Sequence, residues 1–207
     1  MPSALGNLFD YILDRLFDFI FSKDKREEKL LILLVVIGFF LRLVGALNMD
    51  VAADDMVYAS QSANIINAKI ISTHSHPILF FYLTDLSYKV FGYTTLASRF
   101  APLIFGTMLI VVIYLIAKAF FNKQVALLSA FFAAFSNFLV KMTFTDHSLV
   151  TFFFVFFGAY MGLLHLKKRG MKFLVLSAIF FGLGALTKYN AAFFILAFSI
   201  FYLCFIH

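Results

Sequence analysis

Long apolar runs separated by short polar stretches dominate the sequence. A helix that crosses the roughly 30 Å hydrocarbon core of a bilayer needs about 20 mainly apolar residues. Five runs reach or approach that length: Leu30 to Leu47, Thr95 to Ala117, Gln124 to Val140, His147 to Leu166, and Phe173 to Ile206. The last run is too long for one crossing, and the polar residues 187–190 divide it into two. The pattern therefore predicts an all-α, polytopic membrane protein with about six transmembrane helices.

A few residues inside these runs predict local features of the helices. Arg42 is the only charge in the first run and lies near its end, so we expect its side chain to reach the membrane interface. Arg99 falls in the opening turns of the second run, where Pro102 predicts a bend. Gly158 and Gly162 have the small-xxx-small spacing that is typical of close helix packing.

The segment Pro77 to Phe91 is apolar at first but carries Asp85 and Lys89, and it is short for a span. If it lies in the interface, three basic clusters fall on one side of the membrane, which the positive-inside rule assigns to the cytoplasm. If it spans, the first cluster and the later two fall on opposite sides. We therefore expect an interfacial helix that begins at Pro77, and a cytoplasmic N-terminus. The clusters are Lys23, Lys25, Arg26 and Lys29; Lys118 and Lys123; and Lys167, Lys168, Arg169 and Lys172.

This topology divides the chain into two parts. Residues 1–29 hold an amphipathic helix over 3–21, with an apolar face opposite an acidic one, followed by the first basic cluster. Residues 30–207 form the transmembrane domain, with a long first extracytoplasmic loop over 48–94. No signal peptide is expected, because the basic cluster follows the first apolar segment and no small-residue cleavage site follows the first span.

Composition agrees with a membrane location. Hydrophobic residues make up 63% of the chain and charged residues 14%, against roughly 45–50% and 25% in soluble domains. The net charge of +6 comes from loop lysines and arginines and not from one soluble basic face, so a nucleic-acid partner is not expected. The single cysteine excludes a disulfide framework and a cysteine-based zinc site.

Ionisable side chains from four parts of the chain share the outer membrane face in this topology. Such groups are costly at membrane depth, so their common side predicts a cavity that handles a charged substrate. The residues are Asp54, Asp55, His74, His76, Arg99, Asp146, His147 and Lys188.

Taken singly, these residues have simpler explanations. Asp55 and Asp146 each precede or open an expected helix, where a carboxylate commonly caps the backbone. Lys188 has a stem long enough to snorkel to the interface. Arg99 could bind a lipid phosphate in a purely structural role.

Five segments of the sequence carry a family resemblance. In chain order they are Ala53-Asp54-Asp55-Met56-Val57-Tyr58-Ala59, His76-Pro77-Ile78-Leu79-Phe80-Phe81-Tyr82-Leu83, Ala97-Ser98-Arg99-Phe100-Ala101-Pro102, Thr145-Asp146 with the apolar run after it, and Gly182-Leu183-Gly184-Ala185-Leu186-Thr187-Lys188. In this order they resemble the GT-C membrane glycosyltransferases, closest to the branch of protein O-mannosyltransferases and the aminoarabinose transferase of lipid A. The resemblance covers about residue 30 to the end. Asp55 stands where the family usually has Glu, and Ile78 replaces the second residue of a Pro-Pro pair.

The resemblance implies a sugar donor linked to a polyprenyl phosphate, and an acceptor that is a protein, a lipid or a glycan. It implies a single displacement with inversion at the anomeric carbon, in which Asp54 takes the acceptor's proton. Asp55 and Asp146 would position the acceptor or bind a divalent metal, which prefers hard oxygen ligands.

The resemblance also implies how the donor is bound. Arg99 and Lys188 would hold its phosphate, with His76 and Tyr58 as further substrate contacts. Asp54 and Asp146 are the expected ligands of a divalent metal, Mg²⁺ or Mn²⁺. No nucleotide-binding loop is present, so no nucleotide cofactor is expected.

Two alternatives remain open at this point: a transporter or lipid flippase, and a non-catalytic membrane subunit. A transport path would place ionisable groups at several depths, whereas here they gather at one face. The family normally has more spans than this chain, so we expect an N-terminal portion truncated at its C-terminal end. The expected location is the cytoplasmic membrane.

Overall fold

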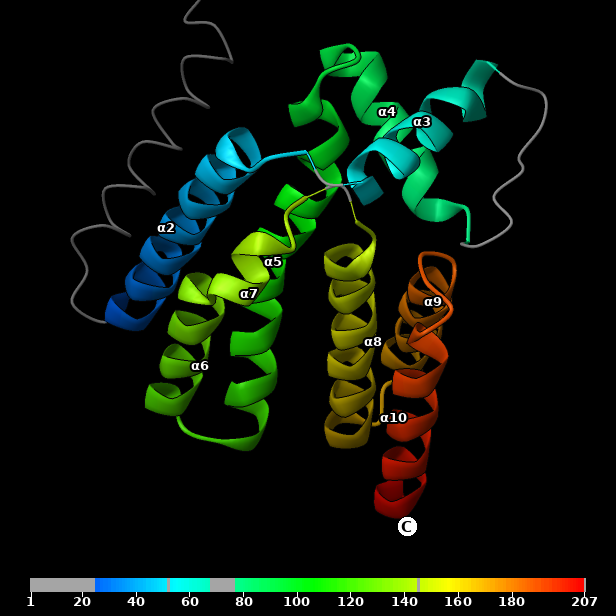
Figure 1. Ribbon diagram of the computed structural model, residues 1–207. Coiled ribbons are helices and arrows are strands. Elements are labelled where there is room, and N and C mark those ends of the chain that lie inside the picture. The colour runs from blue at the N-terminus through cyan, green and yellow to red at the C-terminus, as the bar shows by residue number, and fades with distance from the viewer. Residues whose placement is uncertain (1–24, 52, 68–76, 145, 207) are drawn as a thin grey trace, which may run out of the picture.

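The computed structural model describes residues 25–51, 53–67, 77–144 and 146–206, and these ranges contain helices and no strands (Figure 1). The amphipathic helix expected over 3–21, together with His74 and His76, lies outside the described residues. The helices are α2 (Arg26–Asn48), α3 (Ala53–Asn67), α4 (Leu79–Phe91), α5 (Thr95–Phe120), α6 (Lys123–Phe135), α7 (Asn137–Lys141), α8 (Ser148–Lys168), α9 (Met171–Ala185) and α10 (Ala191–Ile206).

Three of these helices, α2, α5 and α8, are long and apolar enough to cross a membrane, with 23, 26 and 21 residues. Shorter apolar helices, α6, α9 and α10, occupy the other expected spans. Large hydrophobic side chains such as Phe40, Phe132 and Phe193 are more than half exposed in the isolated chain. The all-α, multi-pass membrane fold predicted from the apolar runs is thus confirmed.

The region from Gln124 to Val140 is two helices and not the single span that the apolar run predicts. The helix is interrupted at Ser136, whose backbone is extended (φ −60°, ψ 113°). The Ser136 hydroxyl accepts a hydrogen bond from the backbone N–H of Leu139 at 3.3 Å and so begins α7. Hydropathy does not reveal this break, because a short polar residue before Asn137 is a capping signal and not an interruption of the apolar pattern.

Arg42 is fully buried, so the expectation that it reaches the interface is wrong. Its guanidinium donates to the backbone oxygens of Ala133 at 2.9 Å, Ala134 at 3.3 Å and Gly38 at 3.0 Å. The last carbonyls of a helix have no partner within that helix. Because α6 ends just after Ala134, its terminal carbonyls supply the acceptors that keep this cation inside the bundle.

Helix α5 lies at the centre and packs against α2, α4, α6 and α8. Thr94 caps it by accepting a hydrogen bond from Ala97 N–H at 3.1 Å, and the helix continues through Pro102. Short α3 and α4 lie across one end of the bundle (Figure 1). Helix α4 begins at Leu79, two residues after the predicted start at Pro77.

The glycine pair on α8 packs closely against the last two helices. A Cβ at Gly158 would lie 3.1 Å from the Phe181 ring of α9, and one at Gly162 would lie 2.6 Å from the Phe198 ring of α10. Ser177 of α9 donates a hydrogen bond to the Gly158 oxygen at 2.8 Å. The prediction that this spacing serves helix packing is confirmed.

Candidate functional site

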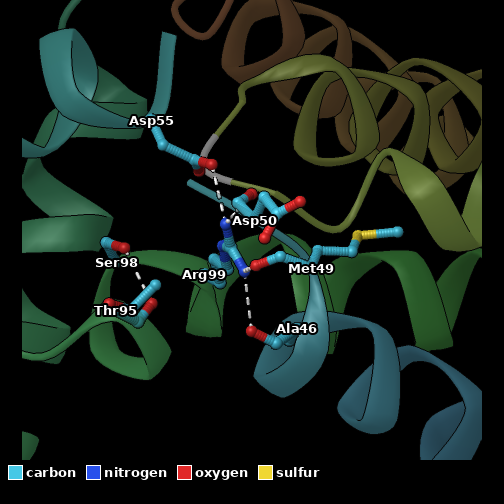
Figure 2. A network of polar contacts seen from close by, with 7 residues as sticks. All are labelled: Ala46, Met49, Asp50, Asp55, Thr95, Ser98 and Arg99. Carbon is cyan, nitrogen blue, oxygen red and sulfur yellow. Dashed lines mark hydrogen bonds and ion pairs between the residues drawn. The ribbon is translucent and has the colours of Figure 1, made fainter. Parts of the chain in front are cut away.

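Asp55 and Arg99 form a buried ion pair at the end of the bundle covered by α3 and α4 (Figure 2). The Arg99 Nη2 lies 2.7 Å from Asp55 Oδ2, and the two side chains are 0% and 3% exposed. Asp55 is the third residue of α3, so its charge faces the positive end of that helix dipole. It is therefore an ion-paired carboxylate in the first turn and not the N-cap.

The same guanidinium also caps the end of α2. Nη1 donates to the oxygens of Ala46 at 2.8 Å and Met49 at 3.1 Å, and Nη2 donates to the oxygen of Asp50 at 3.1 Å. Together with Asp55, these acceptors match the four N–H groups on the two terminal nitrogens. Arg99 thus joins α2, α3 and α5, and its terminal donors face protein oxygens and not an open surface.

Asp146, His147, Ser148 and Lys188 form a second polar cluster, where the loop before α8 meets the turn after α9. Asp146 Oδ1 lies 2.9 Å from His147 Nδ1 and 3.8 Å from Lys188 Nζ. Asp146 Oδ2 accepts the Ser148 N–H at 3.1 Å, and Lys188 donates to the Ser148 hydroxyl at 3.0 Å. The expected capping role of Asp146 is therefore present, and it coexists with a contact to a cation.

Asp146 is 7% exposed, and its surroundings favour the ionised form. Burial alone would raise the pKa of the carboxyl group. Hydrogen bonds from His147 and Ser148, together with the positive charge of Lys188, outweigh burial and hold the pKa of Asp146 well below its usual range. These contacts therefore stabilise the ionised form of the Asp146 carboxyl group.

Aromatic contacts join the first-loop helix to this second cluster. The Tyr58 ring of α3 meets the buried His147 ring edge to face, with centroids 4.5 Å apart. Phe80 of α4 stacks on the His147 ring, with centroids 5.2 Å apart, and also meets Tyr58 edge to face at 6.4 Å. Because Tyr58 lies one turn after Asp55, the acidic end of α3 and the Asp146 loop belong to one packed unit.

Two further hydrogen bonds tie the remaining segments together. The Leu79 N–H at the start of α4 donates to the Leu186 oxygen at 2.9 Å, and the hydroxyls of Thr151 and Thr187 lie 2.8 Å apart. The five segments that carry the family resemblance thus meet at one end of the bundle, although they are spread over more than 130 residues of sequence.

The roles expected of Asp54 and His76 remain predictions. The backbone of Asp54 lies in α3 directly before Asp55. The Asp54 side chain and the whole of His76 are not among the parts of the chain that the structure describes. Ser148 and Phe80 are neighbours of the site that the sequence reasoning missed. Ser148 follows Asp146 by two residues at a helix start, a spacing that offered a signal.

Within the described ranges, no three His, Cys, Asp or Glu side chains are grouped so that they could hold a metal ion. The two oxygens of Asp146 already face His147, Lys188 and Ser148. These residues do not fit a preformed metal centre, and the pairing of Asp54 with Asp146 as ligands stays a prediction.

Residues 75–207, more than half of the chain, match the family described as dolichyl-phosphate-mannose-protein mannosyltransferase. The chain belongs to this family. No curated protein sequence matches it. The match confirms the resemblance to GT-C membrane glycosyltransferases and, with the apolar helices, a multi-pass membrane protein.

Two solved structures share the fold. One is the archaeal oligosaccharyltransferase AglB from Archaeoglobus fulgidus in complex with an inhibitory peptide and a dolichol-phosphate, with a TM-score of 0.70 and 21% identity over 84% of this chain. The other is the apo form of the Archaeoglobus fulgidus oligosaccharyltransferase, with a TM-score of 0.69 and 20% identity over 83% of this chain. The chain spans about a quarter of the length of each, 25% in both cases.

Proposed function

We propose that this chain is the donor- and acceptor-binding part of an inverting membrane glycosyltransferase that uses a polyprenyl- or dolichyl-phosphate sugar. The observation that carries the proposal is the packing of the first-loop acidic helix against the Asp146–Lys188 cluster through Tyr58 and His147. Family membership supports the class of reaction. The dolichol-phosphate and the peptide in the AglB complex support a lipid-phosphate donor and a protein acceptor.

In the proposed reaction the acceptor oxygen attacks the anomeric carbon as the bond from that carbon to the lipid phosphate breaks. Asp54 takes the proton from the acceptor. Lys188 faces the departing phosphate, because it is a partly exposed ammonium held by Ser148. A fixed cation at the leaving group stabilises the negative charge that develops there.

Arg99 and Asp55 have different roles from those expected of a free phosphate ligand and an acceptor contact. Arg99 donates to three backbone oxygens and to Asp55, so we assign it to positioning the start of α3. Asp55 anchors that helix turn, and Asp54 is thereby held in place for catalysis.

The test is Asp54→Asn in membranes that contain the full-length protein, assayed with a radiolabelled polyprenyl-phosphate sugar. We expect a loss of transfer of at least about a hundredfold, since a general base contributes on the order of 10² to 10⁴ in rate. Glu28→Gln, a similar change of an exposed carboxylate at the start of α2, is the matched control and should leave transfer unchanged. Near-normal turnover of Asp54→Asn, at equal protein level, would remove Asp54 from the base role.

The same assay separates the two alternative functions. A flippase would move the labelled lipid across the membrane without transferring its sugar, and a non-catalytic subunit would do neither. The polar groups of the site lie at one end of the bundle and not at several depths, which favours interfacial chemistry over transport.

A further inference from the structure

The end of the bundle opposite the candidate site is strongly basic. It contains the start of α2, the turn between α5 and α6, and the turn between α8 and α9 (Figure 1). The described acidic residues at this end are Glu27 and Glu28. The described basic residues there are Lys25, Arg26, Lys29, Lys118, Lys123, Lys167, Lys168, Arg169 and Lys172.

Glu27 fixes one side of this basic end. Its carboxylate lies 2.8 Å from Lys118 Nζ and 3.0 Å from Lys123 Nζ, and it also accepts a hydrogen bond from the Tyr114 hydroxyl. These contacts link α2, α5 and α6. The one carboxylate and the two ammonium groups together carry a net charge of +1. The Lys118 ammonium is therefore held at the end of α5 and does not move freely in solvent.

A cavity of about 140 Å³ opens between α5 and α8 next to this group. Lys118 and Lys167 border it, and Lys167 donates one hydrogen bond to the Ala119 oxygen at 2.5 Å. An ammonium has three N–H donors, so each lysine retains capacity for another oxygen. The rest of the lining is Leu115, Ala119, Tyr160, Leu163 and Leu164.

We propose that this cavity binds the headgroup phosphate of an anionic phospholipid from the adjacent leaflet. The lysines would bind the phosphate, and the leucine side chains would contact the first part of an acyl chain. Two cations lie directly beside an apolar wall, at the ends of α5 and α8, which are both long and apolar enough to cross a membrane. A soluble phosphate would use the cations but would gain nothing from the apolar wall, so a lipid fits better.

The proposal is independent of the catalytic function, and it is tested on the purified full-length protein by native mass spectrometry. The probes are phosphatidylglycerol, phosphatidylcholine and inorganic phosphate. We expect phosphatidylglycerol to be retained in preference to phosphatidylcholine, and Lys118→Gln with Lys167→Gln to weaken its retention about tenfold or more. The matched control is Lys168→Gln with Lys172→Gln, which removes the same charge from lysines that lie over the Phe173 ring outside the cavity.

A second variant, Ala119→Leu, keeps both lysines and fills the cavity, and it should also lose retained phosphatidylglycerol. Helical circular dichroism and the thermal unfolding midpoint identify which variants are folded. Equal loss in the cavity and control lysine pairs would overturn the proposal, because it would indicate only general attraction to a basic surface. Full retention by folded Ala119→Leu, or displacement of the lipid by millimolar inorganic phosphate, would overturn it as well.

Discussion

Two arginines, Arg42 and Arg99, are both 0% exposed, and both donate to the backbone oxygens at the end of a neighbouring helix. Arg42 lies inside the bundle and contacts backbone oxygens of α2 and α6. Arg99 lies at the end of the bundle covered by α3 and α4 and adds a carboxylate partner, Asp55. The difference indicates that the same device, a buried guanidinium on unpaired carbonyls, closes a helix break in one place and positions an acidic helix in the other.

Arg99→Met should have the largest effect. It removes the hydrogen bonds at the end of α2 and leaves the Asp55 carboxylate buried without its cation, and breaking such a pair costs about 3–5 kcal/mol. We expect a free energy of unfolding lower by about that amount and loss of sugar transfer. Adding Asp55→Asn to Arg99→Met should recover part of the stability, measured by denaturant titration in detergent. A double variant as unstable as Arg99→Met alone would show that the ion pair is not what the arginine supports.

Arg42→Met should have a smaller effect on stability and little effect on chemistry. It leaves the oxygens of Ala133 and Ala134 without their donors, at a cost of about 1–3 kcal/mol, but it leaves no buried charge. We expect a lower unfolding midpoint with turnover per folded molecule within about twofold of the unmodified protein. Turnover that falls as far as it does in Arg99→Met would remove the distinction between the two arginines.

Asp146→Asn removes a charge at the candidate site. Of the three substitutions it should have the smallest effect on the free energy of unfolding, about 1–2 kcal/mol. Because the pKa of Asp146 is held below its usual range, its stabilising contribution is present above about pH 4. That contribution is lost as the pH falls further, toward the pKa in the folded state. The difference in unfolding free energy between the unmodified protein and the variant should be constant from pH 5 to pH 8 and shrink only below about pH 4. A difference that already shrinks near neutral pH would contradict the ionised state of Asp146.

The apolar runs predicted the helical segments well because the requirement to cross a bilayer is a simple constraint on length and hydropathy. They did not predict the break at Ser136 or the burial of Arg42, since each depends on the other: the carbonyls freed at the end of α6 make the interior acceptable for a cation. The sequence placed Asp55 and Arg99 on the same side of the membrane. It did not pair them, because they are 44 residues apart and no local pattern connects them.

The same limit applies to the Asp146 cluster. The sequence predicted that Asp146 and Lys188 share the outer face, and the structure brings them within 3.8 Å of each other. The contribution of Tyr58 and Phe80 was not predictable as a contact, because aromatic packing around His147 depends on how α3 and α4 lie across the bundle. The residue types indicated the chemistry of the candidate site, whereas only the tertiary fold shows which residues contact one another.

The proposed function requires the first-loop acidic helix and the Asp146–Lys188 cluster to face the same side of the membrane, opposite the basic end. It is tested most directly by labelling with a membrane-impermeant maleimide in sealed, right-side-out vesicles, on a Cys204→Ser background. Asp50→Cys and Tyr189→Cys, both at exposed positions beside the site, should react from outside, and Arg169→Cys at the basic end should be protected until the vesicles are opened. Labelling of positions 50 and 189 from opposite sides would contradict a shared site and, with it, the proposed enzyme.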